Sequence, residues 1–142
     1  MYSLKGKKLK DQHGHLVKAE KIISESSVIA LFFSASWSKH CNEFIPLLKE
    51  IYAENVKLDY NITIINVPFD EKKGAMEDHF KTQGDWYTIL YGDTVATELQ
   101  WHYGISYIPN IIVLDPEGNV VSRNGIQDVI QYNKNVLVAW TR

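Results

Sequence analysis

The fold is decided by residues 28–41, which read VIALFFSASWSKHC. Their first part, Val28–Phe33, is apolar without alternation, a pattern that favours a central strand buried on both faces. A helical pattern follows, because apolar residues recur at i, i+3, i+4, i+7 and i+8 from Phe44 to Tyr52. Pro46 lies inside this stripe and removes one backbone donor, so we expect a kink there.

Strands and helices alternate along the rest of the chain. Ile62–Val67 is a β-branched run, which completes a strand–helix–strand unit with the right-handed crossover expected of parallel strands. Helical patterns follow over residues 72–82 and 94–103. Ile111–Leu114 and Val120–Ser122 flank a turn with Pro second and Gly fourth, so we expect them to pair as an antiparallel hairpin.

The two ends of the chain are less regular. Leu9 and Leu16-Val17 flank a turn signal at residues 11–14, which predicts a short hairpin. Residues 126–140 are expected to form a short helix or a further edge element. The sum is one α/β domain, a mixed sheet with helices on both faces. Its expected parts are a hairpin at about 5–20, a core at about 28–125 and a C-terminal element at about 126–140.

Composition excludes several classes of function. The 142 residues are 45% hydrophobic and 23% charged, which is ordinary globular composition. A net charge of −2 gives no electrostatic reason to expect nucleic acid or an anionic membrane as partner. No apolar run approaches the roughly 18–20 residues that cross a bilayer. No glycine-rich phosphate loop is present, so we expect no nucleotide cofactor, and none of another kind is indicated.

The single cysteine, Cys41, is the sharpest constraint. It excludes an intrachain disulfide and any zinc site with two or more cysteines. A reducing compartment, the cytoplasm or the nucleus, is therefore the expected location. His13 and His15 have a spacing that could place both on one strand face, but Gly14 between them favours a solvated hairpin tip over a metal site.

The junction between the buried strand and the helix carries the candidate chemistry. Ser38 is expected near a helix N-terminus, where free N–H groups and the dipole favour negative charge. Lys39 and His40 follow in the first turn, where cations are unfavourable unless an anion lies beside them. A cysteine at position 38 would be that anion, because such surroundings lower the pKa of a thiol. The alternative is that Ser38 only caps the helix, which serine does well.

The segment WSKHC, residues 37–41, resembles the WCxxC motif of the thioredoxin superfamily with its first cysteine replaced by serine. Pro46 stands where that superfamily has its helix-kinking proline, and Ile108-Pro109 is similar to its cis-proline. Further stretches resemble the nucleoredoxin and tryparedoxin branch, and the similarity covers roughly residues 5–140. These stretches are residues 33–37, 68–71, 84–87, 103–109, 114–118 and 139–140. The resemblance implies a thioredoxin-like fold.

The same resemblance implies a protein-disulfide oxidoreductase. In that family the first cysteine attacks a substrate disulfide, and the second, more buried one resolves the mixed disulfide. Carried over by position, Ser38 occupies the place of the nucleophile and Cys41 that of the resolving thiol. The resemblance also implies that Lys39 and His40 tune the pKa of the thiolate and that Trp37 shields the site. It implies that Ile108 and cis-Pro109 bind the backbone of the substrate. Asp85 and Trp86 would line the rim of the same face. For Trp37 and Trp86, burial as core aromatics is the alternative.

Partners follow from the family in the same way. They are proteins with redox-sensitive cysteines or disulfides, transcription regulators among them, and a thiol electron donor. The chain itself is expected to be a monomer or a weak homodimer. Because the hydroxyl of Ser38 is no thiolate and forms no disulfide, the chain as it stands is expected to be inactive in dithiol turnover. Either a nucleophilic cysteine has been replaced by serine, or the chain is a natural redox-inactive or monothiol relative that binds peptides.

Overall fold

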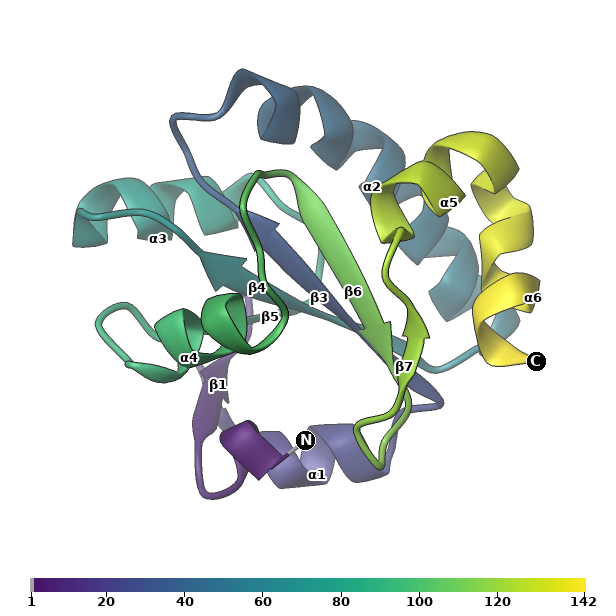
Figure 1. Cartoon of the computed structure of the whole chain (residues 1–142), viewed down its shortest axis with the longest axis horizontal. Helices are drawn as coiled ribbons and strands as arrows, with labels where there is room; N and C mark the ends of the chain where they lie inside the picture. The colour runs from purple at the N-terminus through teal and green to yellow at the C-terminus, as the bar shows by residue number, and fades with distance from the viewer. Residues whose placement is uncertain (1) are drawn as a thin grey trace.

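The strand β3 (Val28–Ser34) forms the centre of the structure, a computed structural model that describes residues 2–142 (Figure 1). All seven residues of β3 are buried, as the uninterrupted apolar run predicts. It pairs in parallel with β4 on one side and antiparallel with β6 on the other. The sheet has seven strands in the order β2-β1-β5-β4-β3-β6-β7. The other strands are β1 (Lys8–Lys10), β2 (Leu16–Lys18), β4 (Ile62–Pro68), β5 (Tyr87–Ile89), β6 (Asn110–Leu114) and β7 (Val120–Ser122).

Helices cover both faces of the sheet, which confirms the predicted α/β class. They are η1 (Tyr2–Leu4), α1 (Ala19–Ser24), α2 (Lys39–Leu58), α3 (Lys73–Lys81), α4 (Val95–His102), α5 (Gly125–Tyr132), η2 (Asn133–Asn135) and α6 (Val136–Thr141). The helix α2 is continuous through Pro46. Within residues 2–142, no helix is long and apolar enough to cross a membrane.

Alternate residues of β3 face two separate hydrophobic clusters. Val28, Ala30 and Phe32 pack into one cluster with side chains of α2, α5 and α6. Ile29 and Leu31 pack into the other with side chains of η1, α1 and α4. The period of two along a strand buried on both faces produces this division. The position of α2 is thereby fixed over the first face, with its N-terminus just past the end of β3.

Two elements are absent from the sequence predictions. The strand β5 has three residues and directly follows the break at Gly84-Asp85-Trp86, so it is too short to show a period. The helix α1 begins at the residue after β2, and Lys18 at its N-cap makes no capping hydrogen bond. Residues 126–140, for which a helix or an edge element was predicted, lie in the helices α5 and α6 and the turn between them.

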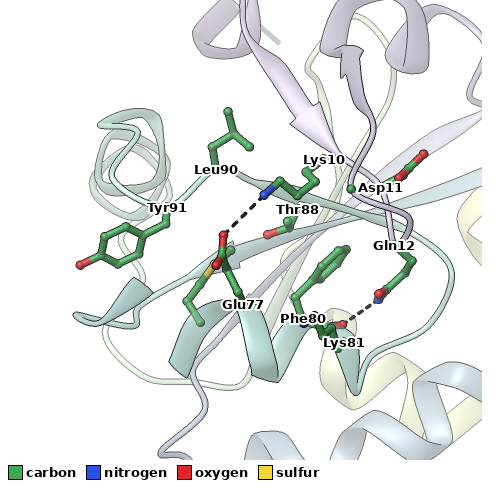
Figure 2. A pocket seen from close by; sticks show the side chains of 11 residues that line it. Lys10, Asp11, Gln12, Glu77, Phe80, Lys81, Thr88, Leu90 and Tyr91 are labelled. Atoms are coloured by element: carbon green, nitrogen blue, oxygen red, sulfur yellow. Dashed lines mark hydrogen bonds and ion pairs between the residues drawn. The ribbon is translucent and has the colours of Figure 1, made fainter. Parts of the chain in front are cut away.

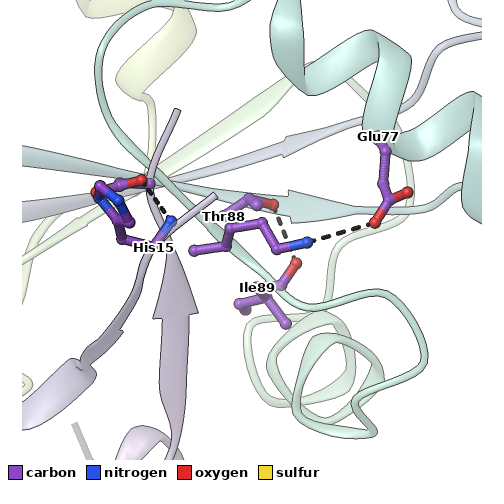
Figure 3. Close-up of polar contacts among 6 residues, drawn as sticks. His15, Glu77, Thr88 and Ile89 are labelled. Carbon is purple, nitrogen blue, oxygen red and sulfur yellow. Dashed lines mark hydrogen bonds and ion pairs between the residues drawn. The ribbon is translucent and has the colours of Figure 1, made fainter. Parts of the chain in front are cut away.

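The N-terminal hairpin extends the sheet beyond β5. Its strand β1 pairs antiparallel with β5, with Leu9 opposite Ile89. Lys10 Nζ forms an ion pair with Glu77 of α3 at 3.4 Å, with both residues labelled in Figure 2 and Glu77 seen from another side in Figure 3. The side-chain amide of Gln12 donates to the Phe80 carbonyl at 2.6 Å (Figure 2). A cavity of about 240 Å³ between the hairpin, α3 and β5 remains behind these contacts.

Two glycines provide a test of the packing between α5 and β6. A Cβ at Gly125 would overlap Ile111 Cγ2 and lie 2.8 Å from the Ile111 carbonyl oxygen, whereas a Cβ at Gly74 of α3 meets no atom within 4 Å. We predict that Gly125→Ala lowers the free energy of unfolding by about 1–3 kcal/mol. The matched control Gly74→Ala is expected to raise it by roughly 0.5 kcal/mol. Urea denaturation measures both, and equal stability of the two variants would contradict the packing described.

Candidate functional site

Ser38 is the N-cap of α2. Its backbone is extended, with φ −90° and ψ 114°, and its Oγ accepts a hydrogen bond from the backbone N–H of Cys41 at 3.2 Å. Its side chain is nearly buried, with 7% of the residue exposed. The capping role is thus confirmed. It also places Oγ beside the free N–H groups of the first turn, where an anion would be stabilised.

Cys41 lies one turn into α2 and is fully buried. Burial raises the pKa of its thiol above the ordinary value, and the negative charge of Asp70 acts in the same direction. The side chain of Ser38 and the backbone of Ala35 oppose this rise through hydrogen bonds. A buried thiol with a raised pKa is protonated at neutral pH and is a poor nucleophile. A protonated, buried thiol of this kind suits a residue that reacts only with a sulfur atom already bound beside it.

The first turn of α2 holds the basic residues Lys39 and His40 and no acidic residue. The side chains of Lys39 and His40 are exposed. Lys39 Nζ lies 3.8 Å from Glu43 Oε1, and both side chains are largely in solvent, so this ion pair contributes little to stability. The positive end of the helix dipole and two basic side chains therefore surround Ser38 without an anion in the first turn.

Asp70 holds the loop that precedes Ser38. It lies just past β4, and its carboxylate accepts hydrogen bonds from the backbone N–H of Ser36 at 3.1 Å and from Ser36 Oγ at 2.5 Å. The sheet register explains this placement, because Ser34 and Pro68 pair at the ends of the parallel strands β3 and β4. Sequence reasoning missed Asp70 as a functional residue. Its position after a parallel strand, at the edge where such sheets hold their sites, was the available signal.

His79 of α3 holds the same loop from the other side. Asn42 Nδ2 donates a hydrogen bond to the Ser36 carbonyl at 3.1 Å. The other amide atom, Asn42 Oδ1, lies 2.8 Å from His79 Nε2 and accepts a hydrogen bond from it. His79 is buried, with 7% exposed, and burial lowers the pKa of its imidazole while the charge of Asp70 opposes this. His79 also lines a groove of about 610 Å³ between α2 and α3. His79 lies within the helix predicted over residues 72–82, but the sequence carried no sign of its link to Ser36.

The Ile108-Pro109 peptide bond is cis. Asn110, the next residue, pairs with Phe33 at the end of β3, so Pro109 lies at the same end of the sheet as Ser38. Trp37 is 67% exposed, and its burial as a core aromatic, one of the two predictions for it, is wrong. Tyr107, next to Ile108, is 62% exposed.

The prediction that Asp85 and Trp86 line this face is wrong, and for Trp86 the alternative prediction, burial as a core aromatic, is confirmed. Trp86 is 1% exposed and packs edge-on against Tyr52 of α2, with 5.3 Å between the ring centroids. Tyr52 lies in the second half of α2, far along the helix from Ser38. Asp85 belongs to the same neighbourhood, because its charge contributes to raising the pKa of Tyr52 to about 12, after the larger effect of burial. The loop before β5 points this pair away from the end where β3 and β4 terminate.

His13 and His15 lie exposed in the N-terminal hairpin, which confirms the predicted solvated tip. The rings of His13 and His15 are 6.2 Å apart, and the backbone N–H groups of both residues donate to Asp11 Oδ1. Within residues 2–142 no group of three or more His, Cys, Asp or Glu side chains could hold a metal ion.

Comparisons with known proteins agree with this geometry. The chain matches a family model described as Thioredoxin-like over residues 26–120. It is 31% identical over 108 residues to nucleoredoxin from Xenopus laevis and 32% identical over 107 residues to nucleoredoxin from Homo sapiens. These matches cover 75% of this chain but 26% and 24% of those proteins, so the chain spans about a quarter of their length.

Solved structures with this fold include two that cover nearly the whole chain. Thioredoxin from Wuchereria bancrofti is 33% identical with a TM-score of 0.82, over 94% of this chain and 92% of that one. Tryparedoxin I from Crithidia fasciculata is 24% identical with a TM-score of 0.84, over 94% and 91% of the two chains, a likeness that shows the fold.

The central strand of the mixed sheet leads into a helix capped at Ser38, and cis-Pro109 lies at the same end of the sheet. These features together define the thioredoxin-like class of fold. The chain belongs to the thioredoxin-like family, with nucleoredoxins among its relatives and tryparedoxins among its structural neighbours. This membership supports an oxidoreductase type of function.

The burial of Cys41 predicts slow chemical modification. We expect iodoacetamide at pH 7.5 to alkylate the native chain at least about tenfold more slowly than the urea-unfolded chain, because the raised pKa and lack of access both reduce thiolate attack. Mass spectrometry over time gives the two rates. Equal rates would show that Cys41 is accessible and would contradict the site described.

The lowered pKa of His79 predicts an acid sensitivity of folding. Below the unfolded pKa of about 6.5, the unfolded chain binds a proton at His79 more readily than the folded chain does. Stability is therefore expected to fall as the pH drops below about 6.5 toward the folded pKa. His79→Gln, whose amide N–H retains a donor toward Asn42, should have a shallower slope of unfolding free energy against pH. An unchanged slope in urea titrations from pH 7.5 to 5 would refute this.

Proposed function

We propose that residues 37–41 and cis-Pro109 form a thiol–disulfide exchange site whose nucleophile position is occupied by Ser38. One observation carries the proposal: Ser38 Oγ lies at the positive end of α2, 3.2 Å from the backbone nitrogen of Cys41, the only thiol. The hydroxyl and the thiol are thus three residues apart across the first turn. This spacing suits transfer of a disulfide between two sulfur atoms if position 38 carries one.

With a cysteine at position 38, the reaction balances as follows. Its thiolate attacks one sulfur of a partner disulfide, forms a mixed disulfide and releases the first partner thiolate, which takes a proton. Cys41 then loses its proton and attacks the sulfur at position 38. This step releases the second partner thiol and leaves a disulfide between positions 38 and 41. The partner has gained two electrons, and an external dithiol donor restores the site by the reverse exchange.

With serine, neither sulfur-transfer step can begin. A serine hydroxyl is not ionised at neutral pH and forms no disulfide, and the remaining thiol is buried. We therefore propose that the chain as it stands holds partner segments without dithiol turnover. The exposed Trp37 and Tyr107 on either side of the site support this binding role.

The partners that suit such a site are proteins with redox-sensitive cysteines or disulfides, met in a compartment that keeps thiols reduced, the cytoplasm or nucleus. A second candidate function is a natural binding module that never exchanges disulfides. The well-formed cap that Ser38 makes with Cys41 favours it, because serine needs no thiol chemistry to be useful at this position.

Reduction of insulin disulfides, with dithiothreitol as donor, tests the proposal. We expect Ser38→Cys to accelerate the reaction at least about tenfold over dithiothreitol alone, because it restores the missing nucleophile at the helix N-terminus. The unaltered chain and the Ser38→Cys/Cys41→Ser double variant should remain at background, and circular dichroism verifies that all are folded. If Ser38→Cys is folded and stays at background, the exchange-site proposal fails and the binding module remains.

A further inference from the structure

Three loops meet at the end of the sheet where β3 terminates. Residues 35–38 leave the end of β3, and residues 103–109 join α4 to Asn110, which pairs with Phe33. Figure 1 shows both segments at this end of the sheet. Residues 122–125 reach it from β7, since Gly125 packs against Ile111, the second residue of β6. The end of α4 is also here, because Gln100 Nε2 donates to the Pro68 carbonyl at 3.4 Å.

Large aromatic side chains project from these segments into solvent. Trp101, at the end of α4, is 82% exposed, more than the 67% of Trp37 and the 62% of Tyr107. A hollow of about 250 Å³ lies beside Trp101 and is lined by Gln100, Gly104, Ile105 and Ser106. It is smaller than the roughly 300–1,000 Å³ of small-molecule sites, so it suits one apolar side chain. An exposed tryptophan at the rim of a hollow is typical of protein-binding surfaces.

The segments at this end of the sheet carry few charges. Residues 35–41, 100–109 and 122–125 contain the cations Lys39 and Arg123 and no Asp or Glu, and the Asp70 carboxylate contacts Ser36 from the neighbouring loop. Arg123 is exposed and forms no ion pair within residues 2–142. Burial raises the pKa of Tyr103, the first residue of the loop 103–109, and the positive charge of Arg123 opposes this rise. The chain as a whole carries a net charge of −2, so the basic surface is a local feature.

We propose that this basic aromatic surface, formed by Trp37, Trp101, Tyr107, Lys39 and Arg123, binds an extended acidic segment of a partner protein with one aromatic or large aliphatic side chain. The apolar side chain enters the hollow beside Trp101. Carboxylates of the segment then pair with Arg123 and Lys39, which complements the charge of the surface. The inference rests on the proposed function in one respect: the segment continues past cis-Pro109 to Ser38, where a partner cysteine would lie.

Fluorescence anisotropy of labelled peptides tests this surface on the unaltered chain, without any thiol chemistry. The probe is a fluorescein-labelled nine-residue peptide, Gly-Glu-Ser-Glu-Phe-Ser-Glu-Ser-Gly. Its controls replace Phe by Ala, or every Glu by Lys. We expect the probe to bind at least about fivefold more tightly than either control at low salt. Trp101→Ala and Arg123→Ala should each weaken binding at least about fivefold, whereas Tyr132→Ala, an exposed aromatic at the end of α5, should not change it.

Two results would overturn the inference. One is equal binding of the probe and its controls, or no binding of any peptide up to about 1 mM. The other is a dimer in sedimentation equilibrium that Trp101→Ala dissociates, since the occupant of the surface would then be a second copy of the chain. Neither result bears on insulin reduction by Ser38→Cys. The peptide-binding experiment therefore tests the basic aromatic surface, and the insulin experiment tests the exchange site, independently of each other.

Discussion

The structure depends on the burial of β3 between β4 and β6. All seven of its residues are buried, and its alternate side chains belong to two hydrophobic clusters, so any shift in register would expose one set or misplace the other. This constraint fixes where β3 ends. The neighbours of its last residues, Pro68 on β4 and Asn110 on β6, are fixed with it. Ser38, Asp70 and cis-Pro109 lie at the same end of the sheet because they follow or precede those paired residues.

The site combines a fixed frame with an incomplete reactive pair. Asp70 and the Asn42–His79 pair hold Ser36 from two sides, so the loop before Ser38 has little freedom. At the start of α2 the helix dipole and the positive charge of Lys39 favour an anion, but the residue present, Ser38, is a neutral hydroxyl. The single thiol, Cys41, lies out of reach of solvent. We therefore propose that the surface retains binding, and that disulfide exchange is the chemistry for which its geometry is suited.

Local sequence predicted the part of the structure that strong periodicity and capping control. The apolar run of β3, the stripe of α2 and the cap at Ser38 are signals within a few residues, and the structure contains each of them. Trp86 was misplaced because no periodicity constrains the loop before β5, and its burial depends on Tyr52, distant in sequence. The roles of Asp70 and His79 arise from contacts with Ser36 across 34 residues or through Asn42, which no local pattern encodes.

The central claim is that position 38 is an activated thiolate site without its thiol. The most direct test is the pKa of the thiol that Ser38→Cys introduces, in a chain that also carries Cys41→Ser, from the rate of alkylation by iodoacetamide against pH. The helix N-terminus and the positive charge of Lys39 predict a pKa clearly below the ordinary value of about 8.5. A pKa at or above about 8.5 in the folded variant would contradict the claim.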